Sequence, residues 1–398
     1  MTENSALAVW SGAEKAGLLA REKQLHYFFG YDREASRGSQ VSLTMPVRLE
    51  SWTSRTLHPV FQMNLPEGTL LESIRRALAK IAGDDDLTIL RVTGGNQIGR
   101  NRFTLLDANS PDSSEQPESL EELLTYPDTE ELFHELLSRY ALRSGISGVQ
   151  PKVMLEATER GTAASSGFIV KSWGTDYPQL AANEYFCMTA ARLTGLPTPD
   201  FHLSDNGKLF IMKRFDIAPD GTHIGFEDFC SLQGMGTSQK YAGSYERVAR
   251  SIRDYVTGTH LMEARKQFFA TLVLSWMLKN GDAHLKNFGV LYRSPAGPVT
   301  LAPVYDLVST TPYINNDVPA LTLEGTKKWW PKKVLERFAV AHLSLPLNNV
   351  REIFEQTAFS VSATCETVTS YGIEHPEFRE TGKKMVTAWK EGLAGLKG

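Results

Sequence analysis

The spacing of apolar residues changes along the chain, and with it the kind of secondary structure that each part predicts. Residues 7–12 (LAVWSG) and 26–32 (HYFFGYD) are rich in aromatic and branched side chains, which favour strands. Residues 70–83 (LLESIRRALAKIAG) place apolar side chains at helical intervals and end in glycine, a frequent helix stop. The first part of the chain therefore predicts a small α/β domain.

A polar segment follows this first part. Residues 107–119 (DANSPDSSEQPES) contain proline and show no hydrophobic period, so they predict a loop or linker. Residues 120–142 then have the apolar spacing of a broken helix. We place the first domain boundary in this region, because neither segment continues the pattern of the residues before it.

Strands come first and helices later in the remainder of the chain. Residues 152–157 (KVMLEA) and 167–173 (GFIVKSW) predict strands, and residues 183–195 (NEYFCMTAARLTG) predict a helix that ends at its glycine. Asp205-Asn206-Gly207 predicts the turn of a hairpin. Helical spacing dominates after Tyr241, so the sequence predicts an α+β fold with two lobes. The expected domains are residues 1–105 (N-terminal domain), 106–142 (linker and helices), 143–240 (strand-rich lobe with a Gly/Ser loop and a hinge) and 241–398 (helical catalytic lobe).

Composition narrows the functional classes. The formal net charge is −4, with 41% hydrophobic and 22% charged residues, so no overall basic charge attracts the protein to nucleic acid or to an anionic membrane. The three cysteines (Cys187, Cys230 and Cys365) form no CxxC pair, which disfavours a zinc site or a disulfide framework. No signal peptide is visible and no apolar run reaches the roughly 20 residues that span a bilayer. We therefore expect a soluble, cytoplasmic protein.

The strongest chemical signal is a polar cluster directly after a long apolar run. Residues 268–278 (FFATLVLSWML) predict a buried helix, and residues 280–292 (NGDAHLKNFGVLY) leave it as a polar loop that enters a strand. Asp282 and Asn287 have the D-x-x-x-x-N spacing, with His284 between them. Phosphoryl transfer from ATP needs a carboxylate near the accepting hydroxyl and an amide oxygen for magnesium on one rigid loop. The alternative is an aspartate that caps a helix, followed by a turn asparagine.

Three further clusters precede or follow this loop in the order expected of a phosphotransferase. Residues 144–152 (SGISGVQPK) form a small-residue loop that could approach phosphates, Lys171 lies in a strand with Glu184 on the next helix, and Asp306 follows a second hairpin. Each has an ordinary alternative when taken alone: a common turn, a solvent-facing lysine, and an aspartate that ends a strand. Their joint order favours an ATP-dependent kinase.

Two other motifs predict no chemistry. Residues 94–100 (GGNQIGR) are similar to a glycine-rich phosphate loop but precede no clear helix, so they predict a turn. Residues 327–333 (KKWWPKK) are basic and aromatic and predict a surface turn or an interdomain contact rather than a phosphate site.

Taken together, the motifs resemble the HipA family, the serine/threonine kinase toxins of bacterial toxin–antitoxin modules. The similarity covers most of the chain. Its N-terminal motifs are VSLTMPVR (41–48), FQMNLPEG (61–68) and GGNQIG, and its kinase motifs are SGVQPK, FIVK, NEYFCM, KRFD, NGDAHLKNF and VYDLVS. The resemblance implies a two-lobed kinase related to the branch of lipid and actin-fragmentation kinases.

The resemblance also implies a role for each matching residue. Asp282 would be the catalytic base, with His284 and Asn287 on the same loop, and Asn287 and Asp306 would hold Mg²⁺. Glu184 would form the supporting ion pair with Lys171, and the backbone of residues 213–215 would be the adenine-binding hinge. The implied ATP-binding residues are Ser147, Gly148, Val149, Gln150, Lys152, Lys171, Lys213, Arg214, Phe215, His284, Lys286, Asn287, Tyr305 and Asp306.

The chain departs from familiar family members at several positions. Gly145 replaces a serine found in some members, so we expect autophosphorylation at Ser147, with Ser144 as the second choice. A phosphate there adds about −1.5 to −2 charge beside the nucleotide phosphates and should expel the loop by repulsion. Lys213 occupies a hinge position that is often acidic, and GTLLESI after NLPE lacks an arginine often found there, which bears on contact with an antitoxin.

The resemblance therefore implies a Mg-ATP-dependent protein kinase toxin that phosphorylates a cellular protein, such as an aminoacyl-tRNA synthetase, and inactivates itself. Its partner would be a small helix-turn-helix antitoxin of the HipB type, and DNA would be contacted only through that partner. Two alternatives stay open: a kinase of the same fold that acts on a small molecule or lipid, and a catalytically silent binding module in a repressor complex.

Overall fold

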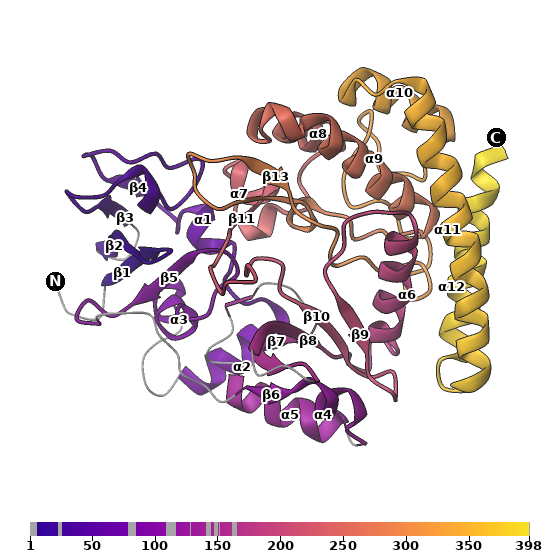
Figure 1. Ribbon diagram of the computed structural model, residues 1–398, viewed down its shortest axis with the longest axis horizontal. Coiled ribbons are helices and arrows are strands. Elements are labelled where there is room, and N and C mark those ends of the chain that lie inside the picture. Colours follow the sequence, from indigo (N-terminus) through magenta and orange to yellow (C-terminus); the bar gives the residue numbers. More distant parts are fainter. Residues whose placement is uncertain are drawn as a thin grey trace.

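The computed structural model describes residues 6–22, 26–78, 85–108, 117–127, 129–140, 145–146, 150, 152–160 and 165–397. The chain forms an N-terminal domain, a second sheet with its own helices, and a helical lobe that carries the C-terminal residues (Figure 1). Within the described residues, no helix is both long enough and apolar enough to cross a membrane.

The N-terminal domain is built on an antiparallel sheet in the order β4-β3-β2-β1-β5. Its elements are β1 (Ala6–Ser11), β2 (Glu14–Glu22), β3 (His26–Tyr31), β4 (Trp52–Ser54), α1 (Pro59–Gln62), α2 (Gly68–Leu78), α3 (Asp86–Thr93) and β5 (Asn101–Thr104). Phe61 packs edge to face on Phe29 and Phe103, with ring centroids 5.2 and 5.8 Å apart, at the centre of a separate apolar core. The strands predicted at residues 7–12 and 26–32 correspond to β1 and β3.

Helix α2 does not bury its apolar residues mainly in this core. It buries them in the largest apolar core of the protein, which the second sheet and the helical lobe share. Its Leu70, Ile74 and Leu78 are buried together with Met154 and Ile169 of the second sheet. The segment around α2 therefore lies within the N-terminal domain predicted from the sequence, but its apolar residues pack against the second sheet.

The second sheet has the order β6-β7-β8-β10-β9. Its elements are β6 (Glu118–Ser119), β7 (Lys152–Thr158), β8 (Ser165–Lys171), β9 (Phe201–Leu203) and β10 (Phe210–Lys213), with α4 (Leu120–Thr125), α5 (Thr129–Tyr140) and α6 (Leu180–Leu193) around it. Alternate residues such as Val153, Phe168 and Val170 pack against α4 and α5, and the others face the main core. Lys152 and Lys171 are direct cross-strand partners, so both are set on the same side of the sheet.

The helical lobe surrounds one long buried helix. Its elements are β11 (Gly225–Asp228), α7 (Phe229–Leu232), α8 (Tyr245–Tyr255), α9 (Leu261–Met277), β12 (Gly289–Tyr292), β13 (Val299–Leu301), α10 (Lys332–Leu343), α11 (Leu347–Glu374) and α12 (Arg379–Ala394). Residues 267–277 of α9 are all buried, because α11 and α12 pack on one side and α8 on another (Figure 1). The polar loop that follows α9 is therefore anchored at its start by the core of this lobe.

The basic motif at residues 327–333 is a surface turn with an aromatic anchor. Trp330 is buried and its carbonyl accepts a hydrogen bond from the indole of Trp276 at 3.0 Å. The indole of Trp329 donates to the carbonyl of Asp317 at 2.9 Å. The two tryptophans thus fix the turn to the helical lobe, as one of the two interpretations of the sequence expected.

Candidate active site

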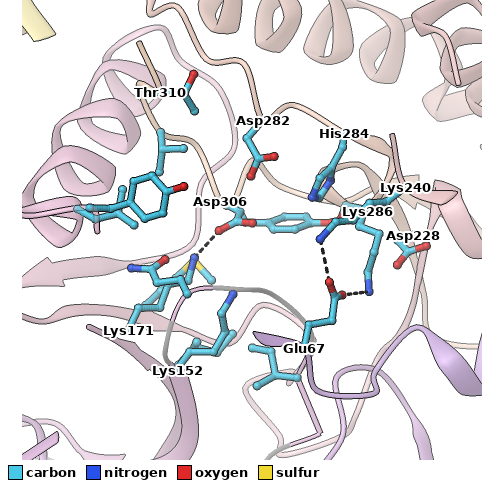
Figure 2. Close-up of a pocket in the computed structure, with 18 of the residues that line it drawn as sticks. Glu67, Lys152, Lys171, Asp228, Lys240, Asp282, His284, Lys286, Asp306 and Thr310 are labelled. Atoms are coloured by element: carbon cyan, nitrogen blue, oxygen red, sulfur yellow. Dashed lines mark hydrogen bonds and ion pairs between the residues drawn. The ribbon is translucent and has the colours of Figure 1, made fainter. Parts of the chain in front are cut away.

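A cavity of about 530 Å³ lies where the N-terminal domain, the second sheet and the helical lobe meet. Figure 2 shows the expected catalytic base Asp282 in this cavity together with Lys152, Lys171, His284, Lys286 and Asp306. The expected ATP-binding residues that line it are Gln150, Lys152, Lys171, Arg214, Phe215, His284, Lys286, Tyr305 and Asp306, whereas Lys213 and Asn287 are not among its lining residues. They come from segments more than 150 residues apart in the sequence, so the fold brings together what the motif order predicted.

Lys171 forms two ion pairs at the cavity, of which the one with Glu184 is fully buried. Its ammonium group lies 2.5 Å from Glu184 on α6 and 2.7 Å from Asp306, and the Lys171 and Glu184 side chains are 3% and 0% exposed. Burial alone would lower the pKa of Lys171, but Asp306 and Glu184 outweigh it and hold that pKa above the usual value. Lys171 is therefore charged at neutral pH and fixed in place by its two carboxylate partners.

Asp306 and Asn287 place two oxygen-bearing side chains beside this lysine. The Asn287 amide donates to Asp306 Oδ2 at 3.0 Å, while its oxygen accepts from the His284 backbone at 3.2 Å. Burial would raise the pKa of Asp306, but Lys171 and Lys152 hold it well below the usual range. Asp306 also has a φ of +56°, an uncommon backbone conformation for aspartate that often accompanies function.

The two side chains are of the kinds that a magnesium ion binds, although in this structure the NH2 of Asn287, and not its oxygen, faces Asp306. A permanently ionised carboxylate and an amide oxygen are hard ligands, and Mg²⁺ takes most of its remaining ligands from water and phosphates. Among the described residues, no group of three or more His, Cys, Asp or Glu side chains could hold a metal by itself. A site with few protein ligands is thus the kind that this part of the cavity could offer.

Asp282 lies on the loop after α9, where its backbone is held by a local hydrogen bond. Its amide donates to the side chain of Asn280 at 2.9 Å, and the hydroxyl of Tyr241 donates to its Oδ1 at 2.7 Å. The pKa of Asp282 is raised to about 6, because burial and the charge of Asp306 raise it more than Tyr241 and Lys240 lower it. A carboxylate with such a pKa is ionised at neutral pH but remains a good proton acceptor.

His284 is a buried, neutral histidine beside Asp282. It precedes the short 3₁₀ helix at Leu285–Asn287 and is 6% exposed. Burial, together with Lys240, lowers its pKa to about 3, so the imidazole is neutral at physiological pH. Its ring packs edge to face on Tyr241, with centroids 5.0 Å apart.

The expected hinge follows β10 and forms an aromatic wall of the cavity. The ring of Phe215 packs on Tyr305 and Phe226, with centroids 5.3 and 5.6 Å apart. The Lys213 side chain instead pairs with Glu159 at 2.5 Å, and the Lys213 amide donates to the carbonyl of Asp200. The structure therefore assigns the aromatic surface to Phe215 and Tyr305, while the Lys213 side chain is engaged elsewhere.

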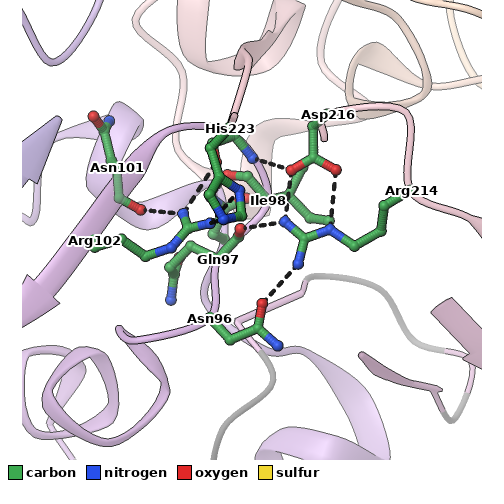
Figure 3. Close-up of polar contacts among 10 residues, drawn as sticks. Asn96, Gln97, Ile98, Asn101, Arg102, Arg214, Asp216 and His223 are labelled. Carbon is green, nitrogen blue, oxygen red and sulfur yellow. Dashed lines mark hydrogen bonds and ion pairs between the residues drawn. The ribbon is translucent and has the colours of Figure 1, made fainter. Parts of the chain in front are cut away.

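Arg214 links the hinge to the N-terminal domain (Figure 3). Its guanidinium pairs with Asp216 at 2.6 Å and donates to the Gln97 carbonyl at 2.7 Å and to Asn96 Oδ1 at 2.6 Å. The side chain, 3% exposed, is thus committed to this contact. The turn predicted at residues 94–100 is in fact the element that docks the N-terminal domain on the hinge.

Four expected site residues (Ser144, Ser147, Gly148 and Val149) lie outside the described residues. Gln150, at the end of that segment, lines the cavity and donates to the carbonyl of Ser172 at 2.9 Å. Autophosphorylation of the loop therefore stays a prediction from the sequence.

Three residues that the sequence did not single out for the site also line it: Glu67, Lys240 and Tyr241. Glu67 belongs to the NLPEG motif, for which the sequence indicated no role in the site. That motif was the signal from which a place for Glu67 in the site could have been predicted. Lys240 and Tyr241 precede α8 in a segment without a motif, and only the tertiary fold brings them to the loop of Asp282.

Comparison with known proteins identifies both parts of the chain. Residues 7–104 match the HipA N-terminal domain and residues 144–365 match the HipA-like C-terminal domain. "Putative kinase Y4dM" of Sinorhizobium fredii is 30% identical over 72% of this chain and 70% of its own, and "Putative kinase Y4mE" of the same organism is 28% identical over 77% and 78%.

The solved structures agree in fold. A chain of the Shewanella oneidensis MR-1 toxin–antitoxin complex of HipA, HipB and operator DNA superposes with a TM-score of 0.69. It is 17% identical, and the match covers 97% of both chains. With both family domains present in order along one two-lobed fold, the chain belongs to the HipA family.

Proposed function

We propose that the protein is a Mg-ATP-dependent serine/threonine kinase that acts on a cellular protein. The observation that carries the proposal is the set of Lys171, Asp282 and Asp306 around one cavity. Lys171 is fixed there by the buried Glu184, and Asp306 accepts a hydrogen bond from Asn287 on the loop of Asp282. These are the positioning and electrostatic groups that phosphoryl transfer requires. The likeness to two relatives named as kinases supports the same class of reaction.

Each group has a defined task in this reaction. Lys171 binds the nucleotide phosphates, and the rings of Phe215 and Tyr305 contact the adenine. Asn287 and Asp306 would hold Mg²⁺, which when bound neutralises charge that develops on the phosphates. The hydroxyl oxygen of the acceptor attacks the γ-phosphorus, the bond to the ADP oxygen breaks, and Asp282 accepts the hydroxyl proton.

We also propose that the kinase is the toxin of a two-component module. Its partner would be a small helix-turn-helix antitoxin, since the HipA chain of similar fold was solved with HipB and operator DNA. Phosphorylation of Ser147 or Ser144 would add about −1.5 to −2 charge next to the phosphate site and switch off the kinase. An aminoacyl-tRNA synthetase is the protein substrate to test first.

Incubation with Mg²⁺ and γ-labelled ATP, alone and with cell lysate, tests the reaction, with Asp282→Asn as the matched variant. Label on one lysate protein and on the 144–147 peptide, both lost in Asp282→Asn, is the expected result. Label on metabolites only would replace the proposal with a small-molecule kinase. Bound ATP without any transferred label would replace it with a binding module.

A further inference from the structure

We infer that Glu67 of the N-terminal domain is a positioning residue of the kinase site, which acts by holding Lys240 and Lys286 on the two segments that frame Asp282. The inference rests on the proposed kinase function and adds to it a role for the N-terminal domain. Glu67 is the charged residue of the NLPEG motif.

The carboxylate of Glu67 bridges two lysines of the helical lobe. Its Oε2 lies 2.8 Å from the ammonium of Lys240 and its Oε1 lies 3.0 Å from that of Lys286 (Figure 2). The three side chains are only 16%, 10% and 9% exposed. Such shielding makes the ion pairs stronger than those of a protein surface, where screening by water leaves little net stabilisation.

A second contact ties the same lysine to the same segment. The ammonium of Lys286 also donates to the carbonyl of Met63 at 3.0 Å. Glu67 itself lies just before α2, and Gly68 has a φ of +55°, a conformation that glycine adopts without strain. The turn thus directs the carboxylate out of the N-terminal domain and into the cavity.

Lys286 lies next to a residue that the proposed reaction uses, and Lys240 lies next to one that contacts such a residue. Lys286 immediately precedes Asn287 in the 3₁₀ turn Leu285–Asn287. Lys240 accepts the backbone N–H of Leu285 on its carbonyl at 3.1 Å, and the adjacent Tyr241 donates its hydroxyl to Asp282. One carboxylate therefore restrains the catalytic loop through Lys286 and the segment that contacts Asp282 through Lys240.

The charges explain what removal of this carboxylate should do. Lys240 and Lys286 are two cations on one anion, so Glu67→Gln leaves two ammonium groups that repel each other in a shielded site. Asp228 and Asp282 are carboxylates that already attract Lys286 and Lys240, and the phosphates of bound ATP would add further anions. Nucleotide binding should tighten while the loop of Asp282 and Asn287 loses its restraint, so kcat and the KM for ATP should fall together.

A role confined to folding gives a different result. Partial unfolding lowers the concentration of active enzyme, and with it the apparent kcat, but leaves the KM of the remaining molecules unchanged. The split between kcat and KM therefore separates positioning from structural support.

The experiment compares full-length wild type, Glu67→Gln and Glu67→Asp in steady-state transfer from γ-labelled Mg-ATP. Glu72→Gln is the matched control, since Glu72 is an exposed glutamate of the same region that pairs with Arg76, one turn away on α2. We expect kcat to fall by about tenfold or more in Glu67→Gln, as for other losses of alignment at a reacting centre, with a lower KM for ATP. Glu67→Asp keeps the charge and should recover part of kcat, and Glu72→Gln should match wild type.

The outcomes distinguish this inference from the proposed function. Wild type that transfers no phosphate to any acceptor overturns the kinase proposal and the role of Glu67 with it. Active wild type with unchanged kcat and KM in Glu67→Gln overturns the role of Glu67 alone, as does a lower kcat at constant KM. If Glu67→Gln does not fold, Glu67→Asp takes its place as the test, because it keeps the carboxylate on a side chain that is one methylene shorter. A kcat and KM equal to those of wild type would then show that the position of this carboxylate does not matter, which would refute the inference.

Discussion

The hydrogen bond from Tyr241 to Asp282 predicts a measurable shift in the pH dependence of the kinase. In Tyr241→Phe the ring that packs on His284 stays, and only the hydroxyl that donates to Asp282 at 2.7 Å is lost. That hydroxyl lowers the pKa of Asp282, which is about 6 in the wild-type protein because burial outweighs the hydrogen bond. Its removal should therefore raise the pKa further.

The magnitude follows from the strength of the bond. A hydrogen bond to a charged group contributes about 1.5–3 kcal/mol, or roughly one to two pKa units. Tyr241 is 44% exposed, so water can take the place of its hydroxyl, and we adopt the lower end, about one unit. Asp282 must be ionised to accept a proton, so the rate falls as the pH drops through its pKa. With a pKa near 7 in place of about 6, the rate at pH 5 should be about tenfold lower than that of wild type, and the rate at pH 8 within about 10% of it.

The assay is the pH profile of single-turnover phosphate transfer between pH 5 and pH 9, so that product release does not mask the chemical step. Tyr140→Phe is the matched control, because Tyr140 donates to Glu118 at 2.6 Å and neither residue lines the cavity. An acidic limb at the same pH in Tyr241→Phe and wild type would refute the link between this hydroxyl, Asp282 and the reaction.

Two other side chains give predictions of stability and binding. Lys171→Met should lower the free energy of unfolding by about 3–5 kcal/mol, because it leaves the buried Glu184 without its counter-charge, and it should abolish ATP binding. The double variant Lys171→Met/Glu184→Leu should regain stability in urea titrations but should not regain ATP binding in calorimetry. ATP binding by either variant would count against the phosphate role of Lys171. Burial raises the pKa of Glu227 to about 7, so the folded protein binds a proton that the unfolded chain releases above pH 4.5, and stability should fall by up to about 3 kcal/mol between pH 4.5 and pH 7. Urea titrations across this range should show a smaller loss in Glu227→Gln, and parallel curves for the two proteins would contradict the shift.

Local patterns predicted the elements that carry the candidate site residues well. The apolar run 268–278 is the end of the buried helix α9, and the loop after it carries Asp282 and Asn287 as the spacing indicated. The cross-strand pairing of β7 and β8 and the hairpin of β9 and β10 were also predictable, because alternation and turn residues are local signals. Lys171 and Glu184 are 13 residues apart, and their ion pair follows from a strand and the helix after it.

Contacts between distant segments could not be predicted in the same way. Tyr241 reaches Asp282 across 41 residues and Lys286 reaches Met63 across 223, and no periodicity encodes such distances. Arg214 has the charge and the position expected of a ligand-binding residue beside the hinge. Its guanidinium instead donates hydrogen bonds to Asn96 and Gln97 in the turn at residues 94–100. These contacts depend on how whole domains pack together. Sequence patterns over one helix or a few strands carry no information about that packing.

The distance between Glu67 and its lysines has a consequence for the order in which the protein matures during translation. The N-terminal domain has its own apolar core and leaves the ribosome first, but the partners of Glu67 follow 173 and 219 residues later. Asp306 is made later still, after the hairpin of β12 and β13. A nascent chain that stops before Asp306 therefore has the docking surface of the N-terminal domain without a working cleft. If the finished enzyme is harmful to its cell, synthesis itself delays that harm until the last third of the chain is under way, and an antitoxin that recognises the N-terminal domain could bind before activity begins.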